Sequence, residues 1–595
     1  MSVTVFRSFI ERVALQISPE ILLSIRKVNV QPRHNPTAKT RITFCLPKFP
    51  SHMKPILVGK AILIVEDYPA MRKAIRNMLY TLDANNITEA DNGLNALAAM
   101  SRTQFDIVLC DYNLGVGKNG QQVLEEARLQ KLISQNCVFV ILSGEQSTSM
   151  VLGAMDSKPD EYLAKPFNAQ QLFVRLERNL TRKAFLQNIE KEIERGNLSQ
   201  AIQQCDKLLA ENNKKIRVHL LKIRAELATL VGDFEAGKRI YSEILHERDL
   251  PWARLGLGVI DFQQGNFSQA GQQFENLLRV HPMFLEGYDW LSRVYEAEDR
   301  LKESQDVVNQ AVDLSPQSIL RQKKLAETAD KIGNIDVAEK AYKAAVSLGK
   351  HSIYKSSSDF TNLAKLYSKT SSPEKALETL SNMRQEFQND PEAELRAITL
   401  EAELHSKAGN DEQANVCLQQ AIDQNKKLGG KTPRDLQLDI AKNCFQQNQQ
   451  GVAEQIMSDL IKTHIDDDQF LDDVRRMQSG IGMDNHSEEL IQRTKRELVA
   501  TNNQGVTLYK QGKFTEAMAL FEKAIASMPE NQTIIINTLK IILHDLKAAG
   551  MDDEKLVRAQ SLLKKARKIG VDRHKLGILQ MEFSNLLRQY NEAKS

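Results

Sequence analysis

The amino-acid sequence predicts an α/β domain followed by a long all-α array of helical repeats. Between residues 54 and 182, short apolar runs alternate five times with segments of helical periodicity, which indicates a doubly wound parallel sheet with helices on both faces. From about residue 183 onward, strand signals fade and a 34-residue period appears. At 595 residues the chain is too long for one hydrophobic core, so more than one folding unit is expected.

The strands of the α/β domain are predicted from apolar runs that end in polar residues. The first run, Ile62–Val65, is continuous rather than alternating, and this is typical of a strand buried on both faces. Further strands are expected at Ile87–Ala90, Ile107–Cys110, Val138–Leu142 and Glu161–Leu163. The helices between and after them are expected from Pro69 to about Asp83, over Gly93–Ser101, from Gly120 to about Gln130, over Ser147–Met155, and from Asn168 to about Leu180.

Polar side chains that could bind a ligand or take part in a reaction lie where these strands end. They are Glu66 and Asp67 after the first strand, Asp111 after the third, Ser143 after the fourth and Lys165 after the fifth. Because the carboxyl ends of parallel strands meet at one edge of a sheet, we expect these side chains to lie together. Two carboxylates 4 Å apart repel by about 4 kcal/mol at an effective dielectric constant of 20, so a cation is expected between them. Oxygen ligands without histidine or cysteine favour Mg²⁺.

In their order along the chain, these motifs resemble the receiver domain of bacterial two-component response regulators. The resemblance covers residues 60–180 and rests on Glu66-Asp67, Asp111-Tyr-Asn-Leu-Gly, Ser143-Gly and Tyr162-Leu-Ala-Lys-Pro-Phe. It implies a five-stranded sheet of flavodoxin-like order, with a histidine kinase or phosphotransfer protein as partner. Asp111 would then accept the phosphoryl group.

The resemblance also implies the roles of the neighbouring residues. Mg²⁺ would be held by Glu66, Asp67, Asp111 and the backbone carbonyl of Asn113. Ser143 and Lys165 would contact the phosphoryl group, and Tyr162 would be the aromatic switch that turns inward on activation. The chain departs from the family's pattern in the loop 111–120, which has glycine in place of the usual proline and is one residue longer than usual.

The helical remainder repeats in the segments 251–284, 285–318 and 319–352, and a further copy covers 498–531. The spacing and residue sizes resemble tetratricopeptide repeats (TPR). In such packing, Ala270 lets two antiparallel helices approach, Leu257 and Phe274 fill the space between them, Gly265 breaks the chain and Pro282 ends the second helix. The other signature residues are Leu291, Tyr295, Pro316, Ala338, Tyr342, Gly505, Gly512, Ala517, Phe521 and Pro529. With weaker copies at Gly196, Gly232, Tyr367, Gly409 and Asn448, we expect about nine repeats.

Residues 1–53 form a basic leader, with eight Lys or Arg against two acids. Since the whole chain carries +3, this net charge of +6 leaves −3 for the remainder, which disfavours nucleic acid as a partner. We expect the leader to be disordered or to lie upstream of the true start; a targeting or membrane-surface segment is the alternative. No apolar run approaches the roughly 18 residues of a membrane span, and the few scattered cysteines favour the reducing cytoplasm.

The expected domain order is a receiver at 54–182, TPR-like repeats at 183–465, an acidic or irregular linker at 466–497, a repeat at 498–531 and capping helices at 532–595. The leading hypothesis is a phosphorylation-dependent response regulator whose output is protein binding through the repeats, with no enzymatic activity beyond its own phosphoryl chemistry. Two alternatives remain open. One is a constitutive scaffold that uses the receiver for docking, and the other is a nucleic-acid-binding regulator.

Overall fold

The computed structural model describes residues 56–594, apart from residues 145, 146, 212, 213, 215, 371, 466, 529, 530, 549, 551, 570 and 572. The basic leader 1–53 and Pro529 therefore lie outside the described residues. Two compact units interleave along the chain. One runs to Gln146 and also contains Ala154–Lys183 and Gly237–Val294, and the other contains Ser147–Gly153, Ala184–Ala236 and Tyr295–Ser595.

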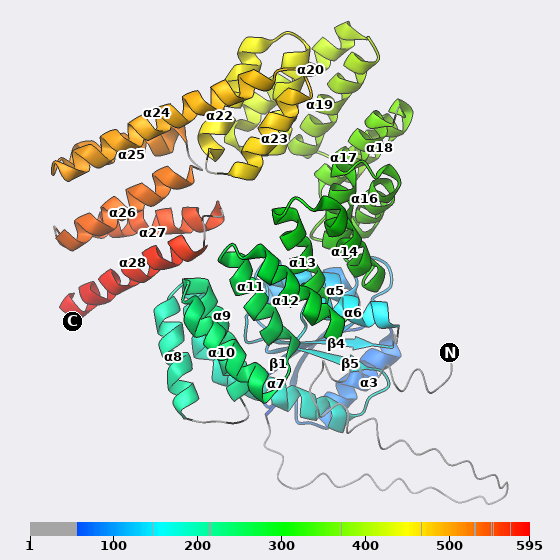
Figure 1. Ribbon diagram of the computed structural model, residues 1–595. Coiled ribbons are helices and arrows are strands. Elements are labelled where there is room, and N and C mark those ends of the chain that lie inside the picture. Colours follow the sequence, from blue (N-terminus) through cyan, green and yellow to red (C-terminus); the bar gives the residue numbers. More distant parts are fainter. Residues whose placement is uncertain are drawn as a thin grey trace, which may run out of the picture. The chain divides into compact units, whose positions relative to one another are not determined.

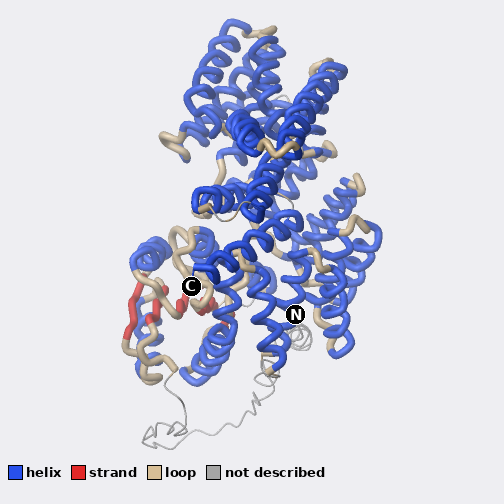
Figure 2. Tube along the Cα trace, turned by 90° about the vertical axis from the view of Figure 1, so that its left-hand side faces the viewer, coloured by secondary structure: helices blue, strands red, loops and turns tan. Residues whose placement is uncertain are grey.

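A five-stranded parallel sheet forms the N-terminal α/β domain, as the sequence predicts (Figures 1 and 2). Its strands are β1 (Ala61–Val65), β2 (Asn86–Ala90), β3 (Ile107–Asp111), β4 (Val138–Ser143) and β5 (Glu161–Ala164). Their order across the sheet is β2-β1-β3-β4-β5, so the chain winds outward in both directions from the centre. The central strands β3 and β4 are buried along their whole length, which explains their unbroken apolar sequences.

Helices cover both faces of this sheet. They are α3 (Pro69–Tyr80), α4 (Gly93–Arg102), α5 (Gly120–Leu129) and α7 (Ala169–Arg195), and a further helix, α6 (Thr148–Asp156), follows β4 along the chain. On one face, Ile75 and Leu79 of α3 and Leu172 and Leu176 of α7 pack against alternate strand residues such as Ile64. The helices α4 and α5 pack against β1 and β4 on the other side.

Two of these helices end elsewhere than expected. Helix α3 stops at Tyr80, because the chain then turns through Asp83, whose φ angle is +62°. Helix α7 continues past Leu180 to Arg195, so the expected domain boundary at 182/183 falls inside a regular helix. No glycine or proline interrupts it before Gly196, and its last turns bury Ile189 in the next apolar cluster.

The rest of the described chain is helical (Figure 2). The helices are α8 (Leu198–Ala210), α9 (Arg217–Val231), α10 (Phe234–Glu247), α11 (Pro251–Gln263), α12 (Phe267–Val280), α13 (Leu285–Ala297), α14 (Leu301–Leu314), α15 (Ile319–Lys331), α16 (Ile335–Gly349), α17 (Ser357–Lys369), α18 (Pro373–Glu386), α19 (Pro391–Lys407), α20 (Asp411–Leu428), the 3₁₀ turn η1 (Gly429–Lys431), α21 (Arg434–Gln446), α22 (Gln450–His464), α23 (Asp468–Ser479), α24 (Asp484–Lys510), α25 (Phe514–Ser527), α26 (Gln532–Ala548), α27 (Asp553–Lys568) and α28 (Arg573–Lys594).

Left-handed residues mark the turns inside successive helix pairs. Gly265, between α11 and α12, has a φ angle of +80°, which glycine adopts without steric cost. The equivalent turns contain Gly196, Gly232, Asp299, Gly333, Gly409, Asn448 and Gly512, all with positive φ. This conformation recurs in four of the five weak copies, at Gly196, Gly232, Gly409 and Asn448, which therefore have the same turn geometry as the strong copies. In the fifth copy, Thr370 at the end of α17 has a φ angle of −92° instead.

The packing inside a repeat differs from the prediction at one position. Ala270 and Phe274 are fully buried, as expected, but Leu257 is only partly buried. The neighbouring Gly258 faces the Phe274 ring instead, and a Cβ atom there would lie 2.5 Å from that ring. Gly505 and Phe521 repeat this relation in the later copy. The close approach of the two helices therefore depends on glycine in the first helix as well as on alanine in the second.

The expected irregular linker at 466–497 is instead helical in its described part. It contains α23 and the beginning of α24, which continues through the expected boundary at 497/498 to Lys510. Despite its many aspartates, α23 is amphipathic, since Phe470, Leu471 and Val474 are buried on one face of the helix. These side chains join the same apolar core as α21, α22 and α26, so packing overrides the local charge.

Candidate functional site

Strand register brings the expected site residues to one edge of the sheet. Val65 of β1 pairs with Cys110 of β3, so the next residues, Glu66 and Asp111, lie side by side. On the other side of β3, Asp111 pairs with Leu142 of β4, and Ser143 follows directly. Ser143 pairs with Ala164 of β5, which places Lys165 one residue beyond the last strand.

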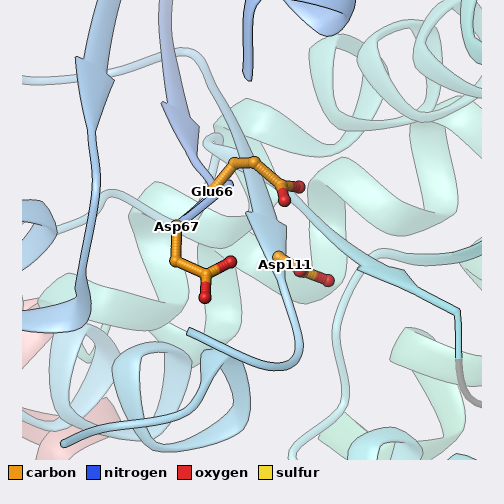
Figure 3. Close-up of side chains that lie close together, drawn as sticks. All are labelled: Glu66, Asp67 and Asp111. Carbon is orange, nitrogen blue, oxygen red and sulfur yellow. The ribbon is translucent and has the colours of Figure 1, made fainter. Parts of the chain in front are cut away.

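Three carboxylates gather at this edge. Glu66, Asp67 and Asp111 each offer an oxygen, and these oxygens lie within 4.8 Å of one another (Figure 3). Glu66 and Asp111 are buried, whereas Asp67 is exposed. The cluster is thus open to solvent on the side of Asp67 and closed on the side of the sheet.

Lys165 neutralises part of this negative charge. Its ammonium nitrogen lies 2.7 Å from a Glu66 oxygen and 3.0 Å from an Asp111 oxygen, and the lysine side chain is 14% exposed. The backbone N–H of Lys165 donates to the carbonyl oxygen of Ser143 at 2.8 Å, which extends the β4–β5 pairing up to the site. A single lysine therefore bridges the two buried carboxylates.

Burial raises the pKa of the Glu66 carboxyl and also that of Asp111 above their ordinary values. In each case the hydrogen bond from Lys165 opposes the rise, and the negative charge of Asp67 adds to it. The positive charge of Lys165 alone therefore does not fully offset the burial and the mutual repulsion of the charged carboxylates. A further positive charge at this place would stabilise them.

The donor set fits Mg²⁺. It consists of carboxylate oxygens only, and oxygens bound to one Mg²⁺ at about 2.1 Å lie at most about 4.2 Å apart. The oxygens of Glu66, Asp67 and Asp111 reach that spacing with small side-chain movements. Asn113, whose carbonyl is the fourth expected ligand, lies in the exposed loop directly after β3.

The loop from β3 to α5 is fixed at both ends. Gly120 begins α5 and its N–H donates to the carbonyl of Tyr112 at 2.8 Å. The position has no room for a side chain, because a Cβ atom would lie 2.2 Å from the carbonyl oxygen of Asp111. Asn119 caps α5 in a reciprocal capping box, and Lys118 forms an ion pair with Glu126 at 2.7 Å.

Two contributors to the site were not expected from the sequence. Gly120 is one, since its contact with Asp111 exists only in the folded chain. Arg72 of α3 is the other, because its guanidinium donates to the carbonyl of Glu66 at 2.5 Å and also contacts Glu89. Helical spacing offers no sign of this contact, because Arg72 reaches back to the turn before its own helix.

The remaining expected residues lie around the same edge. Ser143 is buried at the end of β4, and Tyr162 is half-buried in β5, opposite Ile141. Gly115, which stands at the usual proline position, adopts a φ angle of +71° beside the Asp67 carboxylate. The glycine thus gives the longer loop a backbone conformation that proline could not adopt.

A doubly wound sheet with an acidic cluster and a lysine at its carboxyl edge defines a receiver-type domain, and sequence comparison agrees. Residues 62–177 match the family model described as the response regulator receiver domain. Two further segments, 255–319 and 498–528, match models of the tetratricopeptide repeat.

Curated relatives cover the same region. The chemotaxis protein CheY-3 of Vibrio cholerae is 33% identical over 117 residues, which are 20% of this chain and 88% of that protein. The chemotaxis protein CheY of Pseudomonas aeruginosa is 32% identical over 117 residues, or 20% of this chain and 93% of that protein. Among solved structures, the receiver domain of a sensor histidine kinase from Pseudomonas aeruginosa, with a magnesium ion in its active-site cleft, is 27% identical. The match covers 21% of this chain and 99% of that one, with a TM-score of 0.19.

The chain therefore belongs to the response regulator receiver family, with its receiver domain fused to tetratricopeptide repeats. A receiver domain implies a response regulator of a two-component system, and tetratricopeptide repeats suggest interaction with other proteins. In the described part of the chain, none of the helices combines the length and apolarity needed to cross a membrane.

Proposed function

We propose that this protein is a phosphorylation-controlled response regulator that signals by protein binding. Asp111 accepts a phosphoryl group from a histidine kinase or phosphotransfer protein, and the repeat array binds the target. The observation that carries the proposal is the cluster of Glu66, Asp67 and Asp111 bridged by Lys165 at the carboxyl edge of the sheet. We place the receiver at about 54–182 and assign the repeats and capping helices to the remainder.

The chemistry follows from the position of each group. A carboxylate oxygen of Asp111 attacks the phosphorus atom, the P–N bond to the donor histidine breaks, and the imidazole leaves. Bound Mg²⁺ would neutralise charge on the phosphoryl oxygens. Lys165 is within ion-pair distance of Asp111 and would pair with a phosphoryl oxygen there, while the Ser143 hydroxyl would donate to another.

The signal would leave the site through β4 and β5. Ser143 and Tyr162 lie on these neighbouring strands, and the pairing of Ser143 with Ala164 joins the strand ends. A movement of Ser143 toward a phosphorylated Asp111 would bias the position of Tyr162, which is half-buried and so has both an inward and an outward environment.

The array has features suited to protein binding. Helices of successive repeats are connected by ion pairs, such as Lys324–Glu296 and Lys369–Asp330, which favour a fixed surface. On α13, the half-buried ring of Trp290 packs against Phe262 and Phe274 inside its repeat, and the exposed Arg293 guanidinium lies 4.7 Å from the centre of the ring. Tryptophan and arginine are the residue types that most often dominate binding energy at protein interfaces.

A partner-capture experiment tests this function. The full-length protein is immobilised with Mg²⁺, with and without beryllofluoride as a phosphoryl mimic, and the captured proteins are compared. We expect the captured set to change with the mimic in the wild type, and to stay unchanged in Asp111→Asn. We also expect Trp290→Ala to weaken capture of the responsive partner about tenfold or more. An identical set in all conditions, with mimic binding verified, would instead indicate a constitutive scaffold.

A further inference from the structure

The C-terminal part of the array contains a polar cavity outside the receiver. Its volume is about 280 Å³, and its polar lining consists of Arg434, Thr463, His464, Asp467, Gln532 and Lys568. These residues come from the first turn of α21, the end of α22, the residue before α23, the first turn of α26 and the end of α27. All these helices contribute to one apolar core, so the cavity lies within a single packed body.

Arg434 is held in this cavity by two contacts. Its guanidinium forms an ion pair with Asp467 at 2.5 Å and lies 5.6 Å from the centre of the Phe470 ring. The other Asp467 oxygen caps α23 by accepting the N–H of Phe470 at 3.1 Å. The pKa of the Asp467 carboxyl lies below its ordinary value. Burial raises this pKa, but the hydrogen bonds and the positive charge of Arg434, together with the hydrogen bond from Phe470, lower it by more. Asp467 therefore remains charged and orients Arg434, whose other N–H groups can serve a ligand.

The described residues that line the cavity carry an excess of positive charge. Lys568 is exposed at the end of α27 and forms no ion pair with a described residue. Among the described lining residues, Arg434 and Lys568 exceed Asp467 by one positive charge. The N-terminus of α26, which carries a positive partial charge, begins at Gln532. This helix start is fixed by the fully buried Asn531. The Asn531 side chain accepts a hydrogen bond from the N–H of Ile534 and donates one to the carbonyl oxygen of Lys462.

We propose that this cavity is a binding site for a phosphate-type oxyanion, either free phosphate or a phosphomonoester. Three residues that carry N–H donors, Arg434, Gln532 and Lys568, line it from separate helices. This arrangement suits a tetrahedral group with three or four acceptor oxygens better than a planar carboxylate with two. A single bound water needs only about 10–15 Å³ of such a cavity, so the 280 Å³ here leave room for a phosphate with part of its water shell. The site is independent of the receiver and of its proposed phosphorylation.

Binding is measured by isothermal titration of the full-length protein without Mg²⁺, using inorganic phosphate, O-phosphoserine and acetate as separate probes. We expect one saturable site per chain for a phosphate probe, with acetate at least tenfold weaker. Lys568→Gln should weaken phosphate binding at least tenfold, and so should Arg434→Gln. Lys540→Gln is the matched control, because Lys540 is an exposed lysine of α26 about 12 Å along the helix from Gln532. It should bind like the wild type.

The two possible sources of the oxyanion are distinguished by the probes. Tighter binding of O-phosphoserine than of phosphate would support a phosphorylated partner, whereas binding of phosphate alone would support the free ion. The proposal is overturned if no probe saturates, if acetate binds as tightly as phosphate, or if Lys568→Gln and Lys540→Gln bind alike. Circular dichroism of each variant verifies that a loss of binding is not a loss of fold.

Discussion

Replacing Gly120 by alanine should disturb the receiver site without removing any of its functional side chains. The added Cβ atom would lie 2.2 Å from the carbonyl oxygen of Asp111 and 3.1 Å from the Cα atom of Tyr112. Ordinary Cβ contacts begin near 3.4 Å, so the start of α5 and the end of β3 must separate by about 1 Å. Both neighbours are backbone atoms, and neither can rotate away.

The cost of this change can be estimated from two opposing effects. Overpacking of this kind destabilises by about 1–3 kcal/mol. Alanine in the first turn of α5 recovers up to about 1 kcal/mol of helix propensity, so the expected net loss lies between about 0 and 3 kcal/mol and is centred near about 1.5 kcal/mol. The effect on function should be larger, because a reacting group misplaced by about 1 Å can slow a reaction by about 100-fold. We expect phosphorylation of Asp111 to slow by about 10- to 100-fold in Gly120→Ala.

Two measurements test this prediction. Hydrogen exchange of peptides from β3 and α5 gives the local stability, and time courses with a small phosphodonor and Mg²⁺ give the phosphorylation rate. Gly144→Ala is the matched control, since Gly144 lies at the same sheet edge and a Cβ atom there would meet no atom of the described residues within 4 Å. The reasoning fails if Gly120→Ala is phosphorylated as fast as Gly144→Ala.

Three further substitutions test the electrostatics and the repeat packing. Lys165→Gln should destabilise the receiver by about 3 kcal/mol because it leaves two buried carboxylates without their cation, and Mg²⁺ should restore part of the loss in thermal melts. Burial raises the pKa of Glu403, but Lys442 and Lys407 lower it by more, so the pKa in the folded protein lies below its ordinary value. The charged form of Glu403 therefore stabilises the fold above about pH 4.3, the ordinary pKa of glutamate. That contribution disappears as the pH falls through the lowered pKa. Glu403→Gln should therefore cost about 1–2 kcal/mol at pH 7 and nothing at low pH, as followed by urea unfolding. Gly258→Ala should destabilise its repeat by about 1–3 kcal/mol in hydrogen exchange, because the Cβ atom would overlap the Phe274 ring.

Two of these substitutions have a control variant in the same chain, and for Glu403→Gln the measurement at low pH is the control. Lys60→Gln removes a half-exposed ion pair with Asp106 and should change stability by less than about 1 kcal/mol. In Gly451→Ala, in α22, the added Cβ atom would meet no described atom within 4 Å, so the change should be neutral or stabilising. A second change, Phe274→Leu, should partly rescue Gly258→Ala. The first prediction is contradicted if Lys165→Gln and Lys60→Gln lose equal stability. The second is contradicted if the stability loss of Glu403→Gln persists at low pH, and the third if Gly258→Ala leaves stability unchanged.

The sheet and the edge that carries the site could be predicted because both follow from local patterns. An unbroken apolar run fixes a buried strand, and the residue after it must lie at the sheet edge, as Glu66, Asp111 and Ser143 do. The turns of the repeats were predictable for the same reason, because the left-handed conformation selects glycine, aspartate or asparagine.

Other features depend on contacts between distant segments. Gly258 and Leu257 are adjacent apolar positions of one helix, and only the place of Phe274 decides which of them faces the partner helix. Likewise, Phe470 and Leu471 are surrounded by aspartates, so the charge of the segment concealed its buried face. The polar cavity lined by Arg434 and Lys568 joins five separate helix ends, and no local sequence pattern connects them.

The central claim is that Asp111 accepts the phosphoryl group. The most direct measurement is phosphorylation of the full-length protein by a histidine-phosphorylated donor in the presence of Mg²⁺, followed by mass spectrometry after reductive trapping of the acyl phosphate. We predict a single modified residue, Asp111, and no modification in Asp111→Asn. A modification that persists in Asp111→Asn, or a folded wild-type protein in which no residue is modified, would contradict the account.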